Sequence, residues 1–331
     1  MDAAVKRFIR DTALFLTLAL ALLFFINYFY ESKVLPNHIL EKKDQNYRLY
    51  LSSLDKKQID YAFFGDSHFF NGIDPHQING SFNFGVPNEN YVKIYYKLKQ
   101  ILEQDHVQVK YVILEADLNS LSTLTTDETR LLHELWYYHN YVPFSDIVQI
   151  TGKTSSDVLA RSYLPIIGAR ENLVVDFYHA FWHQTIPELY RGWHCLNGSL
   201  PEDSDVETNA LDRTDTYFKN QNITSPLALA YFEKTVRLAD DNHITVILVR
   251  SPVSKPYDNA TILRNITKEE YYARVFSALK NNTDDYYILD YSSLYFDYPE
   301  YFSDVDHLNC IGSEIFSRRL ATDLESLNKT S

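Results

Sequence analysis

The segment Tyr61-Ala-Phe-Phe-Gly-Asp-Ser-His68 combines a short apolar run with an abrupt turn, and it decides the fold expected for this chain. The run from Tyr61 to Phe64 has no charge, which is typical of a strand buried on both faces of a parallel sheet. Gly65 and Asp66 are turn-forming residues and are expected to end the strand. Ser67 therefore follows the carboxyl end of the first expected strand.

A second short segment, Asp304-Val-Asp-His307, lies near the end of the chain. It places a carboxylate three residues before an imidazole, ahead of a run from Gly312 to Leu327 that predicts a helix. A serine hydroxyl needs an imidazole to take its proton, and a carboxylate fixes the tautomer of that imidazole. Ser67, His307 and Asp304 are thus the candidate nucleophile, base and orienting acid, and Asp306 is close enough in sequence to compete with Asp304.

With these motifs in this order, the chain resembles the SGNH (GDSL-type) hydrolase superfamily. The resemblance implies a three-layer α/β/α, flavodoxin-like parallel sheet and a serine site for acyl transfer. It also implies that the backbone N–H groups of Ser67 and Gly85 bind the oxyanion. The third donor of that family is an Asn in a Gly-x-Asn motif, but here the stretch reads Leu114-Glu-Ala-Asp-Leu-Asn119. The motif is missing, and Asn119 or Asn88 is the candidate substitute.

A second interpretation gives the same residues structural roles. Ser and Asp both cap helices well, so Gly65 to Ser67 would be a turn that starts a helix. Asp304 and His307 would then be unrelated polar residues.

The N-terminus predicts one membrane anchor. Residues 12–30 carry no charge, and nineteen helical residues span about 28 Å, close to the ~30 Å hydrocarbon thickness. Lys6, Arg7 and Arg10 precede the run, so residues 1–11 are expected in the cytoplasm and residues 31–331 outside it. A cleaved signal peptide is the alternative, but no small-x-small site follows the apolar run.

Two further patterns agree with export of residues 31–331 from the cytoplasm. The chain has seven Asn-x-Ser/Thr sequons, which begin at Asn79, Asn197, Asn222, Asn259, Asn265, Asn281 and Asn328. Its two cysteines, Cys195 and Cys310, either pair in an oxidising compartment or remain free thiols.

Composition excludes one class of partner. The net charge is −13 among 331 residues, whereas phosphate binding requires clustered Lys and Arg, so nucleic acid is not expected. Hydrophobic residues make up 45% of the chain, which is ample for a core.

Apolar runs that alternate with helical patterns predict a parallel sheet covered on both faces. We expect a lead-in at 31–57, an SGNH-like domain over 58–331, and a mostly helical insertion at 118–242. The expected strands are Tyr61–Phe64, Ser81–Val86, Tyr111–Glu115, Ile244–Arg250 and Tyr286–Asp290, and the expected helices include Tyr91–Gln104 and Pro226–Asp240.

In such sheets the ligand crevice lies beyond the carboxyl ends of the strands. Ser67, Gly85 and Asn119 follow three of these strands, and Asp117 accompanies Asn119. His68, Lys255 and Tyr257 are candidates for the substrate rim. No cofactor is expected. Asp176, His179 and His183 fall at helical spacing, but their aromatic neighbours favour an ordinary helix, so no metal is expected either.

The resemblance narrows to the membrane-anchored DltD, AlgJ and AlgX group, whose members work with multi-spanning membrane-bound O-acyltransferases. It implies an O-acyltransferase or esterase that acts on cell-surface polysaccharide, with an acyl donor as second substrate. The rival expectation is a non-catalytic, membrane-tethered scaffold that binds glycan or such a partner, and the missing Gly-x-Asn motif favours it.

Overall fold

The computed structural model describes residues 2–126, 131, 135–139, 142–169, 173–181, 189–200, 205–218, 224–266 and 268–328. The chain forms two compact units. One comprises residues 1–42 and 132–187, and the other comprises residues 43–131 and 188–331.

The larger unit contains a five-stranded parallel sheet. Its strands are β1 (Gln58–Phe64), β2 (Ser81–Asn83), β3 (Gln108–Glu115), β4 (Thr245–Arg250) and β5 (Tyr286–Asp290). The spatial order is β2-β1-β3-β4-β5, which is the flavodoxin-like order. In register, Phe63 of β1 pairs with Ile113 of β3, which pairs with Ile247 of β4. The predicted α/β class is confirmed, and strand order reverses between β1 and β3.

The strand boundaries follow the apolar runs closely, and β5 has the predicted limits. β1 and β3 begin three residues before the predicted runs, at Gln58 and Gln108, and β2 ends at Asn83 rather than at Val86. The side chain of Asn83 accepts the N–H of Gly85, so the backbone turns there instead of continuing the ladder. Val86 still donates its N–H to the carbonyl of Gly65, which keeps this loop beside the end of β1.

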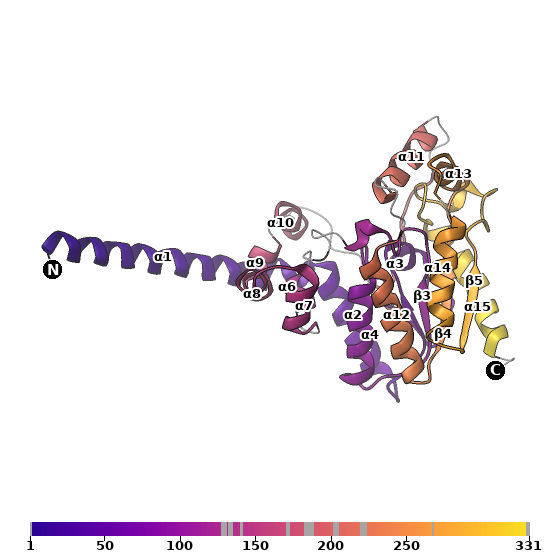
Figure 1. Ribbon diagram of the computed structural model, residues 1–331, viewed down its shortest axis with the longest axis horizontal. Helices are drawn as coiled ribbons and strands as arrows, with labels where there is room; N and C mark the ends of the chain where they lie inside the picture. The colour runs from indigo at the N-terminus through magenta and orange to yellow at the C-terminus, as the bar shows by residue number, and fades with distance from the viewer. Residues whose placement is uncertain are drawn as a thin grey trace. The chain divides into compact units, whose positions relative to one another are not determined.

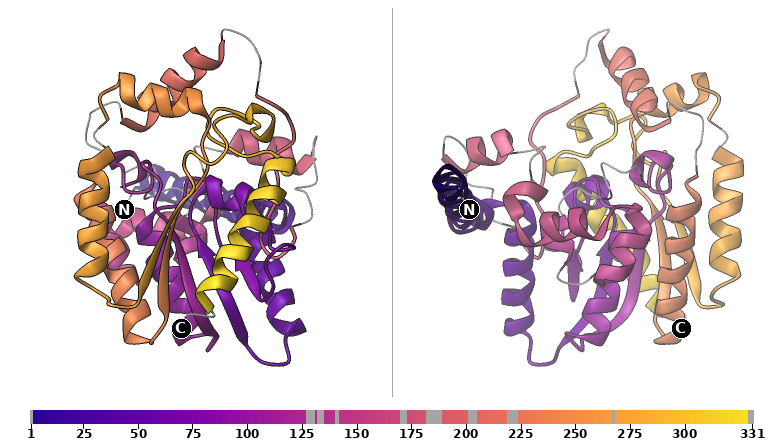
Figure 2. Two further views of the ribbon diagram at one scale, coloured as in Figure 1. Left: turned by 90° about the vertical axis from the view of Figure 1, so that its right-hand side faces the viewer. Right: turned by 60° about the vertical axis from the view of Figure 1, so that its left-hand side comes forward.

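Helices cover both faces of the sheet. Three of them lie side by side on one face (Figure 1): α4 (Tyr91–Glu103), α12 (Pro226–Asp241) and α14 (Lys268–Lys280). Asn90 and Ser225 cap the first two, each accepting a backbone N–H from the first turn. On the other face lies α15 (Cys310–Asn328), which packs against α3 (Ser67–Gly72) (Figure 2). The order strand, turn and α3 places Ser67 at the carboxyl edge of the sheet.

The remaining elements of this unit surround that edge or support β2. They are η2 (Thr123–Thr126), α11 (Asp205–Phe218), α13 (Lys255–Leu263) and η3 (Pro299–Tyr301). α11 packs against α13. Within the predicted lead-in, α2 (Ile39–Ser53) places the rings of Tyr47 and Tyr50 against Phe82, with centroids 5.4 and 5.5 Å apart. Most of α2 is therefore part of the packed sheet unit.

The smaller unit is helical in its described residues. It contains α1 (Ala3–Lys33), η1 (Leu35–Asn37), the start of α2, α6 (Leu135–Tyr138), α7 (Phe144–Thr151), α8 (Ser155–Tyr163), α9 (Pro165–Gly168) and α10 (Leu173–Phe181). Tyr30, Val34, Leu35 and Ala169 form a buried cluster at the end of α1. The predicted 118–242 insertion is thus divided, since 132–187 group with α1 whereas α11 and α12 belong to the sheet unit.

The helix α1 is long and apolar enough to cross a membrane. Its 31 residues measure about 46 Å at 1.5 Å each, which exceeds the ~30 Å hydrocarbon thickness. Large apolar side chains along it are exposed, and Phe15 is 70% exposed. Water is a poor environment for such a surface, so the helix fits a membrane anchor or a signal sequence.

Candidate active site

Ser67 begins α3 directly after the turn that ends β1. The carboxylate of Asp66 caps this helix by accepting the N–H of His68 at 2.9 Å. Gly65 must be glycine, because a Cβ there would lie 2.3 Å from Oε2 of Glu115. Glu115 in turn accepts the N–H of Asp66 at 2.6 Å, so β3 holds the turn that presents Ser67.

Ser67, His307 and Asp304 come together as a hydrogen-bonded chain. Nε2 of His307 lies 2.8 Å from Oγ of Ser67, and Nδ1 of His307 lies 3.0 Å from both carboxylate oxygens of Asp304. Oδ1 of Asp304 also accepts the backbone N–H groups of Asp306 and His307, at 3.0 and 2.8 Å. The loop before α15 thereby fixes the imidazole in a position where it can take a proton from the serine.

A second carboxylate, Asp306, also lies against His307. Its side chain is fully buried, and Oδ1 is 3.3 Å from Nδ1 of His307. Nε of Arg213 lies 3.1 Å from the same oxygen, and Oη of Tyr217 donates to Oδ2 at 3.3 Å. The sequence presented Asp304 and Asp306 as competitors, whereas the structure places both on one imidazole.

His68 extends this network toward β3. It is buried, and its Nδ1 lies 2.8 Å from Oδ2 of Asp117. Its Nε2 is 3.5 Å from Oδ2 of Asp306. Nδ2 of Asn119 donates to Oδ2 of Asp66 at 2.7 Å. The sequence pointed to Asp117 and Asn119 through their place after β3, but the role of Glu115 carried no signal because it reads as the last residue of a strand.

Burial and charge determine the protonation of these groups. Burial lowers the pKa of His307, but the charge of Asp306 and the hydrogen bonds to Asp304 and Asp306 outweigh it and raise that pKa to about 9. Burial also lowers the pKa of His68, but Asp66, Asp117 and Asp306 raise it well above its usual value.

The pKa values of two buried carboxyl groups, Asp306 and Glu115, shift in opposite directions. Burial would raise the pKa of Asp306, but His307 and His68 hold it well below its ordinary value. Burial, together with the charges of Asp66 and Asp117, raises the pKa of Glu115 well above the usual range. Asp306 is therefore ionised at neutral pH, whereas Glu115 releases its proton less readily than an ordinary carboxyl group.

Two of the candidate oxyanion donors are engaged within the protein. Gly85 donates its N–H to Oδ1 of Asn83 at 2.9 Å. Asn119 uses one amide hydrogen on Asp66 and has a second one left. For the N–H of Ser67, no acceptor is found among the described residues. Asn88 is an exposed residue with φ of 61°, and in the described part of the chain no contact links it to Ser67 or His307.

The three substrate-rim candidates differ in their exposure to solvent. Lys255 is exposed at the start of α13. Tyr257 and His68 are buried instead, and both line a cavity of about 20 Å³ with Asp117 and Asn119. The sequence placed Tyr257 on the rim because it follows β4, but the first turn of α13 directs it toward the interior.

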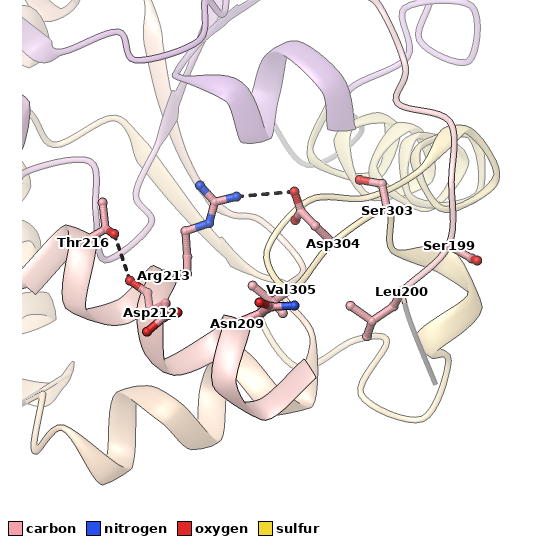
Figure 3. Close-up of a pocket in the computed structure, with 9 residues that line it drawn as sticks. All are labelled: Ser199, Leu200, Asn209, Asp212, Arg213, Thr216, Ser303, Asp304 and Val305. Carbon is pink, nitrogen blue, oxygen red and sulfur yellow. Dashed lines mark hydrogen bonds and ion pairs between the residues drawn. The ribbon is translucent and has the colours of Figure 1, made fainter. Parts of the chain in front are cut away.

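A larger pocket of about 420 Å³ adjoins Asp304 (Figure 3). Residues of α11 and of the loop before α15 form much of its wall: Asn209, Asp212, Arg213, Thr216, Ser303, Asp304 and Val305. Arg213 reaches Asp304 at this pocket, with 3.4 Å between Nη2 and Oδ2. Most of its lining residues have polar side chains, and Asp304 is the member of the Ser67, His307 and Asp304 set that borders it.

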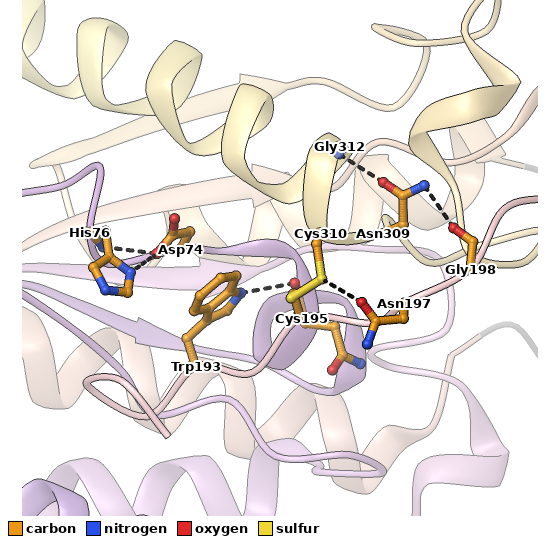
Figure 4. The surroundings of a disulfide bond; sticks show 10 residues. Asp74, His76, Trp193, Cys195, Asn197, Gly198, Asn309, Cys310 and Gly312 are labelled. Carbon is orange, nitrogen blue, oxygen red and sulfur yellow. Dashed lines mark hydrogen bonds and ion pairs between the residues drawn. A yellow bond between two sulfur atoms is a disulfide. The ribbon is translucent and has the colours of Figure 1, made fainter. Parts of the chain in front are cut away.

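A disulfide holds the segment that precedes this pocket to the start of α15 (Figure 4). It joins Cys195 and Cys310, whose Cα atoms are 4.8 Å apart, so the paired alternative is the one observed. Nδ2 of Asn309 donates to the carbonyl of Gly198 at 3.0 Å. These links anchor the residues that immediately follow His307.

Two groups of three side chains have the spacing of metal ligands: His68, Asp306 and His307, and Asp66, His68 and Glu115. Their donor atoms already face partners within the protein, as Nδ1 of His68 faces Asp117 and Nδ1 of His307 faces Asp304. We therefore interpret both groups as parts of one charge network rather than as ion sites. The side chains of Asp176, His179 and His183 lie outside the described residues.

Comparison with known proteins gives weak similarity only. No protein-family model and no curated protein matches the chain. A provisionally assigned acylhydrolase from Bacteroides fragilis NCTC 9343 is 14% identical, with a TM-score of 0.39, over 86% of this chain and 96% of its own. A protein from Streptococcus pneumonia, provisionally described as a platelet activating factor, is 12% identical, with a TM-score of 0.35, over 92% and 99%. At such TM-scores we infer neither family nor function from them.

Proposed function

We propose that this chain is an SGNH-like serine esterase or O-acyltransferase, anchored by α1, that acts on acyl esters of cell-surface polysaccharide. The observation that carries the proposal is the chain of contacts from Ser67 through His307 to Asp304, with 2.8 and 3.0 Å between successive polar atoms. These distances lie within the range required for a serine nucleophile and its general base.

The geometry supports a two-step reaction. Oγ of Ser67 attacks the carbonyl carbon of an acyl ester while Nε2 of His307 takes the hydroxyl proton. His307 then gives that proton to the departing alcohol, and an acyl-serine remains. A sugar hydroxyl or water attacks this ester and gives its proton to Nε2, which passes the proton to Oγ of Ser67 as that oxygen leaves. Asp304 and Asp306 stabilise the imidazolium that exists between these proton transfers.

Membrane anchoring and an extracytoplasmic position are part of the proposal. Lys6, Arg7 and Arg10 precede the apolar part of α1, which favours a cytoplasmic N-terminus. The disulfide between Cys195 and Cys310 fits an oxidising compartment. A multi-spanning O-acyltransferase would be a suitable supplier of acyl groups, as in the DltD, AlgJ and AlgX group. A reporter fused after Ser331 tests the topology, because only an extracytoplasmic reporter should be active there.

A second function has one observation in its favour. The N–H of Gly85 already donates to Oδ1 of Asn83, and the Gly-x-Asn motif that supplies the usual third oxyanion donor is absent. A site with fewer oxyanion donors stabilises the tetrahedral intermediate less, and each lost donor typically reduces kcat by about 10²–10³-fold. The chain would then be a non-catalytic scaffold that binds glycan or an acyltransferase.

A fluorophosphonate probe separates the two functions, because it reacts with an activated serine. The enzyme should be labelled at Ser67, and the Ser67→Ala variant should not be labelled. A wild-type chain that resists the probe while it retains its fold would favour the scaffold.

A further inference from the structure

Two imidazole rings share one buried carboxylate beside Ser67. Nδ1 of His307 lies 3.3 Å from Oδ1 of Asp306, and Nε2 of His68 lies 3.5 Å from Oδ2 of the same side chain. The two rings meet edge to face, with centroids 4.9 Å apart. His68 adjoins Ser67 in the chain, yet it points away from solvent and toward the carboxylate of the His307 loop. Such an arrangement couples the charges of the two rings.

His68 is surrounded by acidic groups on its other sides. Nδ1 contacts Asp117 at 2.8 Å and lies 3.9 and 3.8 Å from the carboxyl groups of Asp66 and Glu115. Oδ1 of Asp117 accepts the N–H of Ser251, which fixes Oδ2 toward the ring. A buried imidazole flanked by the carboxyl groups of Asp117 and Asp306 is stabilised as a cation, because the buried charge of Asp306 would otherwise be uncompensated.

We propose that His68 is a positioning residue for the candidate base His307 and acts through Asp306, the carboxylate that both rings face. This inference rests on the proposed function of Ser67 and His307. A cationic His68 offsets the charge of Asp306 and so weakens its hold on the proton of His307. His307 then becomes neutral, and able to take the proton of Ser67, at a lower pH than it would if Asp304 and Asp306 acted on it without the neighbouring cation.

The other charges around the rings do not remove this effect. Arg213 of α11 also offsets Asp306, but it is divided between Asp306 and Asp304. Tyr217 donates to Asp306 and does not neutralise it. The titratable and charged groups around His307 are Asp304, Asp306 and, through these carboxylates, Arg213. Those around His68 are Asp66, Glu115, Asp117, Asp306 and Tyr217, and Arg250, Tyr257 and Tyr272 line the small cavity beside it. Of these groups only Arg213 and Arg250 carry positive charge.

The test is the pH dependence of fluorophosphonate labelling at Ser67 in the full-length chain. His68→Gln should move the acid limb of the labelling rate upward by about two pH units, because a unit charge about 5 Å away in a buried site acts on that scale. His68→Lys restores a cation and should return the limb toward the wild-type position. His76→Gln is the matched control, since His76 lies four residues after the end of α3, pairs with Asp74 at 2.7 Å, and should leave the limb unmoved.

A second readout does not depend on reaction at Ser67. Hydrogen exchange at the ring carbon, followed by mass spectrometry, reports the protonation of individual histidines in the unreacted chain. His68 should remain protonated at a pH where His307 has lost its proton, and His68→Gln should raise the exchange midpoint of His307. A neutral His68 in that range, or an unmoved His307 midpoint, would overturn the inference. If the exchange midpoints of His68 and His307 behave as expected but Ser67 is not labelled, the proposed function would be overturned and the role of His68 would stand.

Discussion

Nε2 of His307 lies 2.8 Å from Oγ of Ser67, although 240 residues separate them in the chain. The sheet accounts for this proximity. Ser67 leaves the carboxyl end of β1, and the loop before α15 returns to the same edge, where the strand order reverses between β1 and β3. Ligand crevices of open α/β sheets form at this point because neighbouring loops diverge there.

Asp304 and Asp306 should differ in what they contribute. Asp304→Asn should lower the rate of ester hydrolysis roughly 10- to 100-fold, less than the ~10⁴-fold loss typical of a serine triad with one carboxylate, because Asp306 still faces Nδ1. Its stability should change by less than about 1 kcal/mol, since the side chain is partly exposed. Steady-state kinetics and urea denaturation measure the two effects.

Asp306→Asn should also destabilise the fold. It leaves Arg213 and His68 without their shared counter-ion, and removal of one partner from a buried pair costs about 3–5 kcal/mol. A urea midpoint equal to that of Asp304→Asn would show that the buried carboxylate has no such role.

The activity should depend on pH through His307. The base works only when it is neutral, so kcat/KM should rise by about tenfold per pH unit below its pKa and level off above about pH 9. The pKa of His307 is raised because burial, which lowers it, is outweighed by the interactions with Asp306 and Asp304, which favour the protonated ring. Hydrolysis of an activated ester, corrected for the background rate, gives the profile. A plateau already reached near pH 6 would mean that the carboxylates do not hold the proton on His307.

The disulfide should stabilise the part of the molecule that carries His307. It closes a loop of 115 residues, and loss of such a bridge typically costs about 2–5 kcal/mol. Cys310→Ser should therefore lower the urea midpoint, and the Cys195→Ser/Cys310→Ser double variant should match it. Addition of reductant to the wild type should have the same effect and should leave the double variant unchanged. Equal stability of the wild type with and without reductant would contradict this expectation.

Local patterns predicted the sheet well. The apolar runs of β1, β3 and β4 each correspond to a strand, and the turn after Phe64 falls where Gly65 and Asp66 place it. The two site segments were also visible, because nucleophile and base each lie beside a strong local signal. These features depend on neighbouring residues, which a sequence displays directly.

Features that depend on packing between distant segments were not visible. The sequence offered Asp306 as a competitor of Asp304 and His68 as a rim residue, but only the approach of α3 to the His307 loop makes them partners. Tyr257 was expected at a rim, but α13 turns it inward. The division of residues 118–242 between two compact units likewise carries no compositional mark.

The most direct test of the central claim is to trap the acyl group on the enzyme. The full-length chain is mixed with an activated acyl ester and quenched in acid within one turnover. The protein is then digested, and the mass of the peptide that contains Ser67 is measured by mass spectrometry. The proposed reaction predicts that this peptide gains the mass of one acyl group, and that neither Ser67→Ala nor His307→Gln shows the gain. An unmodified Ser67 peptide under conditions where the wild type releases the alcohol would contradict a covalent role for Ser67.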